Sequence, residues 1–144
     1  KPVYYALEMM NRVGDMRYDL GEDAIDNEVG MAAFASDEGT QCILFRQKMK
    51  NNPDLPKEEA EISLEIDAAP RTVFLERIDQ EHCNPLKVWE DMGSPQVPNP
   101  AQVAAIKEKS EMRAEELPFV YEDGKVKVSV ALGVNDVYCI RIVK

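Results

Sequence analysis

The sequence predicts a mainly β protein: an antiparallel β-sandwich of about seven or eight strands with two or three short helices. Apolar and polar residues alternate over 62–66 and again over 125–132, which is the pattern of half-buried strands. Asp37-Glu38-Gly39 and Asp123-Gly124 each separate two apolar runs, as hairpin turns do. Short antiparallel strands joined by turns at short intervals are typical of a sandwich.

The composition fits one soluble globular domain. The chain has 144 residues, of which 44% are hydrophobic and 31% charged. Its formal net charge of −10 argues against binding to nucleic acid or to anionic membranes. Cys42, Cys83 and Cys139 have no metal-ligand spacing, so neither a metal nor another cofactor is expected. One disulfide is conceivable, but an odd number of cysteines favours reduced thiols and hence a cytoplasmic location.

The first expected element is a helix over 3–13. Its residues are apolar around most of the circumference, and only Glu8, Asn11 and Arg12 are clearly polar. Such a helix needs partners on more than one side, and a small domain can supply only one. A second partner outside this chain is therefore expected, and the alternative is a helix buried in this domain or a dimer contact.

The stretch 15–30 is acidic and irregular. Its carboxylates do not alternate with a closing Glu as in a calcium loop, so we expect a solvated linker. Strands are expected after it, joined by a polar connection over 48–61. The expected strands cover 31–36, 40–46, 62–66, 72–78, 117–121, 125–132 and 137–143.

The stretch 77–100 holds the single His and the single Trp of the chain. Asn84-Pro85 reads as an N-cap followed by Pro at the first helical position, and Gly93 suits the end of that short helix. Asn99-Pro100 repeats the device with a capping-box Gln102. A second helix is therefore expected over 100–112, with Val103, Ile106 and Met112 facing inward.

These motifs carry a family resemblance. Arg77-Ile78-Asp79, Asn84, Trp89, Gly93-Ser94-Pro95 and a helix opening at Pro100 together resemble the C-terminal region of glycoside hydrolase family 39, which contains β-xylosidases and α-L-iduronidases. The beginning of the chain resembles the last helix of that family's catalytic barrel, and its end resembles the closing strands. The resemblance implies a residual barrel helix over 1–14, an acidic linker over 15–30, and a sandwich over 31–144 with a helical insertion at 84–112.

The chemistry implied by the resemblance is that of a retaining glycosidase, which needs two carboxylates about 5–5.5 Å apart. In this family the acid/base follows Asn in an Asn-Glu-Pro motif. Asn27-Glu28 is followed by Val29, so we do not transfer the role to Glu28 and expect no catalytic residue in this chain. The expected function is a non-catalytic accessory domain of an O-glycosyl hydrolase, most simply a β-xylosidase. The alternatives are a carbohydrate-binding module and an oligomerisation domain.

Three residues are candidates for the rim of a substrate site: His82, Asn84 and Trp89. A loop His bonded to the backbone and a Trp sealing the edge of the core explain the same residues without a ligand. Asp79 is expected to form an ion pair with Arg77 or to cap the loop.

The expected partners are a catalytic barrel of the same protein and an oligosaccharide. Without the barrel, the first helix should self-associate or be poorly ordered, and its removal should leave a folded sandwich. The contacts expected to mediate self-association are Tyr4, Tyr5, Leu7, Met9 and Met10.

Overall fold

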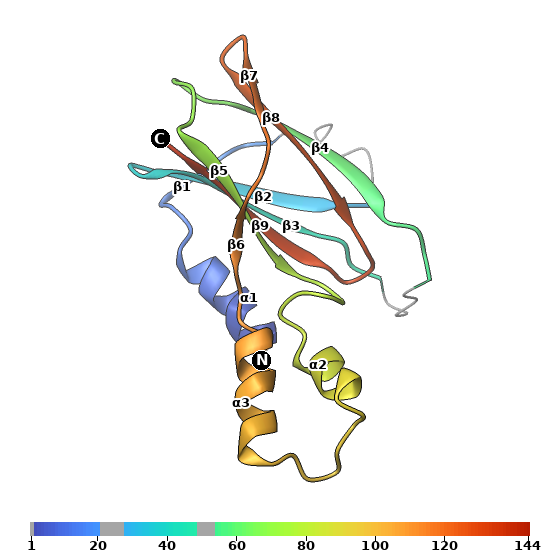
Figure 1. Cartoon of the computed structure of the whole chain (residues 1–144). Coiled ribbons are helices and arrows are strands. Elements are labelled where there is room, and N and C mark those ends of the chain that lie inside the picture. The colour runs from blue at the N-terminus through green and yellow to red at the C-terminus, as the bar shows by residue number, and fades with distance from the viewer. Residues whose placement is uncertain (1, 21–27, 49–53) are drawn as a thin grey trace.

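The computed structural model describes residues 2–20, 28–48 and 54–144, and over these it is an antiparallel β-sandwich with three short helices (Figure 1). The mainly β prediction is confirmed, with nine strands in the described ranges. The elements are α1 (Pro2–Asn11), β1 (Met16–Arg17), β2 (Gly30–Ser36), β3 (Gly39–Phe45), β4 (Glu58–Glu65), β5 (Thr72–Ile78), α2 (Pro85–Asp91), α3 (Pro100–Lys109), β6 (Ala114–Glu116), β7 (Val120–Glu122), β8 (Lys125–Leu132) and β9 (Val137–Val143).

Two sheets enclose the core. The larger has the order β1-β2-β3-β9-β5-β6 and the smaller the order β4-β8-β7. Alternate residues of each strand face the other sheet, so β8 buries Val126, Val128, Val130 and Leu132 and exposes or half-exposes the residues between them. In β9, Tyr138, Ile140 and Ile142 face the core, and Cys139 is buried on the opposite, outer face. The strands β5, β8 and β9 coincide with the predicted ranges.

Two predicted strand boundaries are wrong. The strand β4 begins at Glu58, inside the expected connection, because its backbone pairs with β8 even where its outward side chains are charged. Of the expected strand over 117–121, only Val120 and Tyr121 lie in a strand, β7, while residues 117–119 connect it to β6 of the other sheet. Leu117 and Phe119 pack against the core on either side of Pro118, which has no N–H for a sheet hydrogen bond.

The described residues of the stretch 15–30 take part in the fold, whereas the sequence predicts a solvated linker. Met16 and Arg17 form β1, and the Tyr18 N–H donates to Ala33 O at 2.9 Å. Leu20 packs against the core, and Val29 is buried in it. These residues are part of the sandwich, while 21–27 lie outside the described residues.

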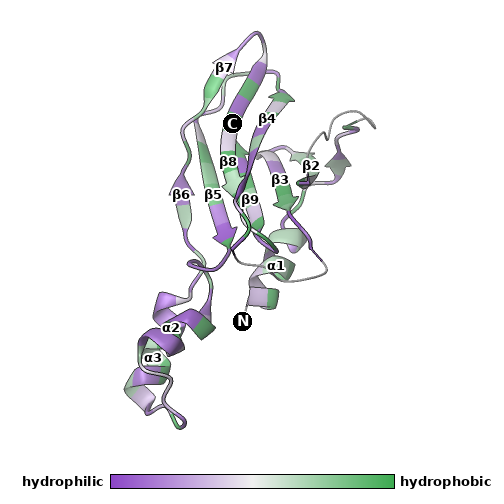
Figure 2. Ribbon diagram, turned by 90° about the vertical axis from the view of Figure 1, so that its right-hand side faces the viewer, coloured by the Kyte–Doolittle hydropathy of each residue, from purple (hydrophilic) through white to green (hydrophobic). Residues whose placement is uncertain are grey.

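The helices α2 and α3 are inserted between β5 and β6, and their predicted caps are confirmed. The Asn84 side chain accepts from Leu86 N and Lys87 N, and Asn99 forms a reciprocal capping box with Gln102. The helix predicted over 100–112 ends at Lys109, so Met112 lies beyond it. The prediction that Val103 and Ile106 face the core is wrong, because neither helix buries any residue. The two helices pack against each other and project from the end of the sandwich (Figure 2).

Candidate functional site

The helix α1 is docked on the outer face of the larger sheet. Met9 is fully buried there, and its carbonyl accepts from Gln41 Nε2 at 2.7 Å. Just beyond the helix, Arg12 binds Glu76 of β5 through both carboxylate oxygens, at 3.2 and 2.5 Å. Met9 is therefore not available for self-association, which corrects the prediction for this residue, and one side of α1 belongs to this domain.

The other side of α1 is apolar and exposed. Val3, Tyr4, Leu7 and Met10 are between 50% and 69% exposed. Exposed apolar rows of this kind are typical of contact surfaces. We call these four residues the outer row of α1.

The loop after β5 is organised by Asp79. One carboxylate oxygen, Oδ1, accepts from Glu81 N at 2.9 Å, from His82 N at 2.7 Å and from the His82 ring at 2.8 Å. Burial of Asp79 opposes ionisation, but these hydrogen bonds outweigh it and lower the pKa of the carboxyl group. The capping role expected for Asp79 is confirmed, whereas Arg77 pairs with Glu115 instead.

The second oxygen of Asp79 and a carboxylate oxygen of Asp136 both lie close to the hydroxyl group of Tyr138. Tyr138 Oη lies 3.3 Å from Asp79 Oδ2, 3.4 Å from Asp136 Oδ2 and 3.1 Å from Ala131 O. A phenol has a single proton to donate, so these three acceptors compete for it. Burial raises the pKa of Asp136, despite the hydrogen bond from Gly133 N. From the sequence, Asn135-Asp136 is recognised only as a turn. Nothing in the sequence predicts that Asp136 and Tyr138 lie close to Asp79.

Asp79 and Asp136 of this cluster line a cavity of about 560 Å3. Its walls come from the start of α1, the loop after β5, α2 and the turn between β8 and β9. We call it the end cavity. Its polar lining includes Asp79, Asn84, Lys87, Glu90, Asn135 and Asp136.

The three predicted rim residues do not share one site. Asn84 lines the end cavity. His82 lines a different hollow of about 280 Å3 beside Arg77 and Glu115. Trp89 lines neither of these two and is half-buried within the helical insertion, where its ring N–H donates to Pro95 O at 3.0 Å. Trp89 therefore does not seal the sandwich core, which corrects that interpretation.

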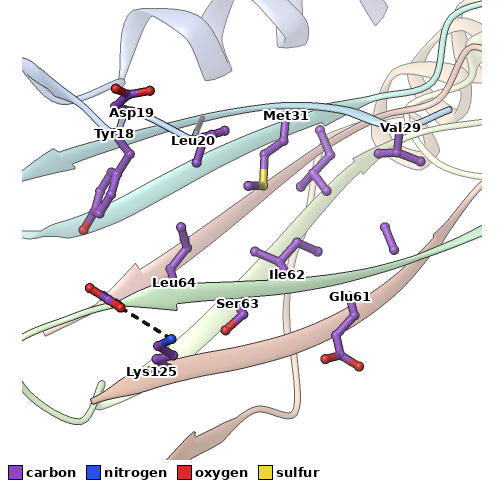
Figure 3. A pocket seen from close by; sticks show the side chains of 13 residues that line it. Tyr18, Asp19, Leu20, Val29, Met31, Glu61, Ile62, Ser63, Leu64 and Lys125 are labelled. Carbon is purple, nitrogen blue, oxygen red and sulfur yellow. Dashed lines mark ion pairs between the residues drawn. The ribbon is translucent and has the colours of Figure 1, made fainter. Parts of the chain in front are cut away.

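A further hollow of about 460 Å3 opens between the two sheets beside β4 (Figure 3). Met31 and Val29 point from one side toward Leu64 and Ile62 on the other (Figure 3). Val29, Ile62 and Leu64 are buried and Met31 packs against them, so this hollow is lined by the hydrophobic core. An ion pair between Lys125 and Glu65, 3.4 Å long, lies at its rim.

Other candidate groups are held structurally. Hydrogen bonds from Lys48 and Arg46 lower the pKa of the Glu28 carboxyl, the opposite of what a catalytic acid needs. All three cysteines are buried and free, and burial raises the pKa of Cys83 to about 11. In the described ranges, no three His, Cys, Asp or Glu side chains gather as metal ligands would. None of the described helices has the length and apolar character needed to cross a membrane.

Comparison with protein families gives one decisive match. The family model described as Glycosyl hydrolases family 39 matches residues 1–127. The chain belongs to glycosyl hydrolase family 39. The resemblance seen in the motifs of 77–100 is thereby confirmed.

Individual relatives agree with this family. A Beta-xylosidase of Caldicellulosiruptor saccharolyticus is 25% identical over 119 residues, which are 83% of this chain and 24% of that protein. The solved GH39 enzyme of Xanthomonas axonopodis pv. citri has the same fold, with a TM-score of 0.71 and 16% identity over 99% of this chain. A monomeric beta-xylosidase of Caulobacter crescentus has a TM-score of 0.66 at 15% identity, again over 99% of this chain.

The family 39 chain is short beside these relatives. It spans 24% of the curated relative and 30% of each of the two solved chains. The chain therefore matches one part of these longer proteins, and its own fold is a β-sandwich.

Proposed function

We propose that this chain is the non-catalytic accessory β-sandwich of a family 39 glycoside hydrolase, and that the enzyme's catalytic barrel lies against the outer row of α1. The main supporting observation is that the two sides of α1 have different surroundings. One side is tied to the sandwich through Met9 and Arg12, and the other presents Val3, Tyr4, Leu7 and Met10 to solvent. A helix shared between two domains has this character.

A non-catalytic role is supported by the burial and the hydrogen bonds of Asp79 and Asp136. Asp79 accepts three hydrogen bonds from its own loop through one oxygen, and its side chain is only 6% exposed. Asp136 is 3% exposed and caps the turn at Gly133. Neither is free to stand across a sugar from the other, as the two carboxylates of a retaining glycosidase do.

Activity of the β-xylosidase type is proposed for the whole enzyme because the curated relative and one of the compared structures carry that name. No catalytic residue is expected in this chain. The glycosidic bond would accordingly be cleaved in the barrel, and the sandwich would support it.

The carbohydrate-binding module is the weaker alternative. Such modules use a row of exposed aromatic rings on a sheet face. Among the strands of the described ranges, Phe45 is the single exposed aromatic residue. An oligomerisation domain would use the same outer row of α1, and the experiment below separates it from the barrel contact.

Side-chain footprinting tests the barrel contact. Hydroxyl radicals should label Tyr4, Leu7 and Met10 strongly in the isolated chain and weakly in the full-length enzyme. Met16, which lies in β1 and is 73% exposed, should be labelled equally in both and serves as the control. Protection in the isolated chain that disappears on dilution would indicate self-association instead. Equal labelling of the outer row in a monomeric full-length enzyme would overturn the proposal.

A further inference from the structure

We propose that the outer face of the larger sheet, beside α1, is a docking site for an acidic segment of the catalytic barrel, and that Arg141 binds a carboxylate of that segment. This inference rests on the proposed function and deepens it, because it names the chemistry by which the barrel would be recognised.

The outer face carries a row of side chains that crosses five strands. Arg141 lies between two core-facing residues of β9, so its side chain points away from the core. Its partners in the neighbouring strands are Gln41 of β3 and Phe74 of β5. Phe34 of β2 pairs with Gln41, and Arg17 of β1 pairs with Phe34. Residues opposite each other in an antiparallel pair share a face, so these five side chains form one row, which we call the outer strip.

Arg141 is held in place without a hydrogen-bonded acceptor among the described residues. Its side chain is 34% exposed, and its guanidinium carbon lies 5.3 Å from the centroid of the Phe74 ring. Its Nε is buried and has no hydrogen-bond partner in the described ranges. The Glu76 carboxylate is 3.5 Å from its Nη2, which is longer than a charge-assisted hydrogen bond, and Arg12 already donates to both Glu76 oxygens. The exposed end of the Arg141 guanidinium can therefore donate to a further carboxylate.

A hollow of about 380 Å3 lies beside Arg141. Arg12 and Gly14, just after α1, form one of its walls, and β2, β3 and β9 contribute the others. Among the described residues of its lining, Arg12 and Arg141 are cationic and Glu38 is anionic. The lining thus carries excess positive charge in a chain whose net charge is −10, and such a local field favours an anionic group.

The outer strip adjoins the contact surface already proposed for the barrel. The helix α1 is docked on this same outer face, so a partner that covers its outer row can also reach the strip. The outer row has four residues, whereas a stable interface has about 20–30 residues on each side. A second copy of this chain is a poorer occupant than the barrel, because two chains of net charge −10 repel each other.

Arginine modification tests the docking site. Phenylglyoxal should modify Arg17 and Arg141 readily in the isolated chain and several-fold more slowly in the full-length enzyme. Arg113 is exposed and lines a different hollow, so it should react equally in both and serves as the control. Equal rates for Arg141 in the two proteins would overturn the inference. Protection in the isolated chain that disappears on dilution would also overturn it, since the occupant would then be a second copy.

Two variants of the full-length enzyme form a matched pair. Arg141→Gln and Arg113→Gln remove the same charge, but only Arg141 belongs to the outer strip. R141Q should reduce the protection of Arg17 from phenylglyoxal about tenfold, because docking loses a charge-assisted hydrogen bond. R113Q should leave that protection unchanged. Urea denaturation of the isolated R141Q chain checks that it folds, and equal protection of Arg17 in the two folded variants would contradict the inference.

A cross-link identifies the group that binds Arg141. In the full-length Arg141→Lys variant, a carbodiimide should join position 141 through an amide bond to an Asp or Glu outside these 144 residues. Mass spectrometry locates the linked peptide, and Arg113→Lys should not give it. A link from position 141 only to Glu38 or Glu76, or no link at all, would overturn the inference.

The outcomes separate this inference from the proposed function. If the outer row of α1 is protected in the full-length enzyme while Arg17 and Arg141 react as in the isolated chain, the inference fails and the barrel contact through α1 stands. Protection of both arginines beside an unprotected outer row would keep the acidic contact and reject the contact through α1.

Discussion

Arg12 and Glu76 join α1 to the larger sheet through a two-pronged ion pair. The Arg12 guanidinium contacts both carboxylate oxygens of Glu76, at 3.2 and 2.5 Å, and the Glu76 side chain is only 7% exposed. Arg141 of the neighbouring strand β9 approaches the same carboxylate at 3.5 Å. Because Glu76 is buried, it depends on these partners for the hydrogen bonds that water would otherwise supply. The ion pair consequently ties the end of α1 to the sandwich.

Replacing Arg12 should destabilise the chain measurably. We expect Arg12→Ala to lower the free energy of unfolding by about 2 kcal/mol, because the buried Glu76 carboxylate loses its main hydrogen-bond donor. The partial exposure of Arg12 keeps the effect from being larger. Arg17→Ala, at an exposed position in β1, is the control and should change little. Urea denaturation measures both, and equal stabilities for the two variants would contradict the role of the pair.

The two sides of α1 should respond differently to substitution. Met9→Ala should cost about 2–4 kcal/mol, because Met9 is fully buried. Leu7→Glu, at a residue 57% exposed, should leave the unfolding free energy nearly unchanged and make the isolated chain more monomeric. Thermal melts and light scattering measure these effects.

Removing α1 should destabilise the sandwich, contrary to the prediction from sequence. An unchanged thermal melt after deletion of the helix would restore that prediction.

Trp89→Ala should have a local effect. The Trp89 ring is half-buried in the helical insertion and bonds Pro95 O, away from the sandwich core. We expect a loss of about 1–2 kcal/mol confined to α2 and α3, less than the roughly 3–5 kcal/mol typical of a core Trp. Hydrogen exchange should speed up in the insertion and stay slow in β9. Faster exchange throughout the sheets would show that Trp89 supports the core after all.

Asp136 and Asp79 should have opposite effects on stability as pH changes. The pKa of Asp136 is raised in the folded chain, so its ionised form costs stability, and this cost is absent below its ordinary pKa. Asp136→Asn should therefore be neutral or stabilising by about 1 kcal/mol at pH 7, and this gain should vanish below about pH 4.

The pKa of Asp79 is lowered, so its contribution is present above its ordinary pKa and is lost as pH falls through the folded value. Asp79→Asn should destabilise the chain by about 1–3 kcal/mol at pH 7, with the difference shrinking below about pH 4. Urea denaturation at several pH values measures both variants. Parallel pH profiles for the two would contradict the assignment of opposite shifts.

Much of the fold could be predicted because its signals are local. Alternation in β8 and β9 and the caps at Asn84 and Asn99 depend on residues close in sequence. The start of β4 could not be predicted in this way, because its pairing with β8 depends on backbone rather than on side chains. The wrong prediction of an inward face for α3 has a similar origin, since Val103 and Ile106 are apolar but lie on a projecting helix (Figure 2).

The candidate site was predicted only in part for the same reason. Asn84 was named from its motif, and it does line the end cavity. Asp136 and Tyr138 reach Asp79 from more than fifty positions away, as contacts across the fold do. His82 and Trp89 are close to Asn84 in sequence, but the loop and α2 turn them toward different surroundings.

Turnover of nitrophenyl β-xyloside is the most direct test of the accessory role. The purified chain should hydrolyse none, and the full-length family 39 enzyme should hydrolyse it with or without Asp136→Asn in this part. Asp136 and Asp79 are the carboxylates to test, because they meet at Tyr138 and their pKa values are displaced in opposite directions. Hydrolysis by the isolated chain that disappears in Asp136→Asn or Asp79→Asn would contradict the non-catalytic role.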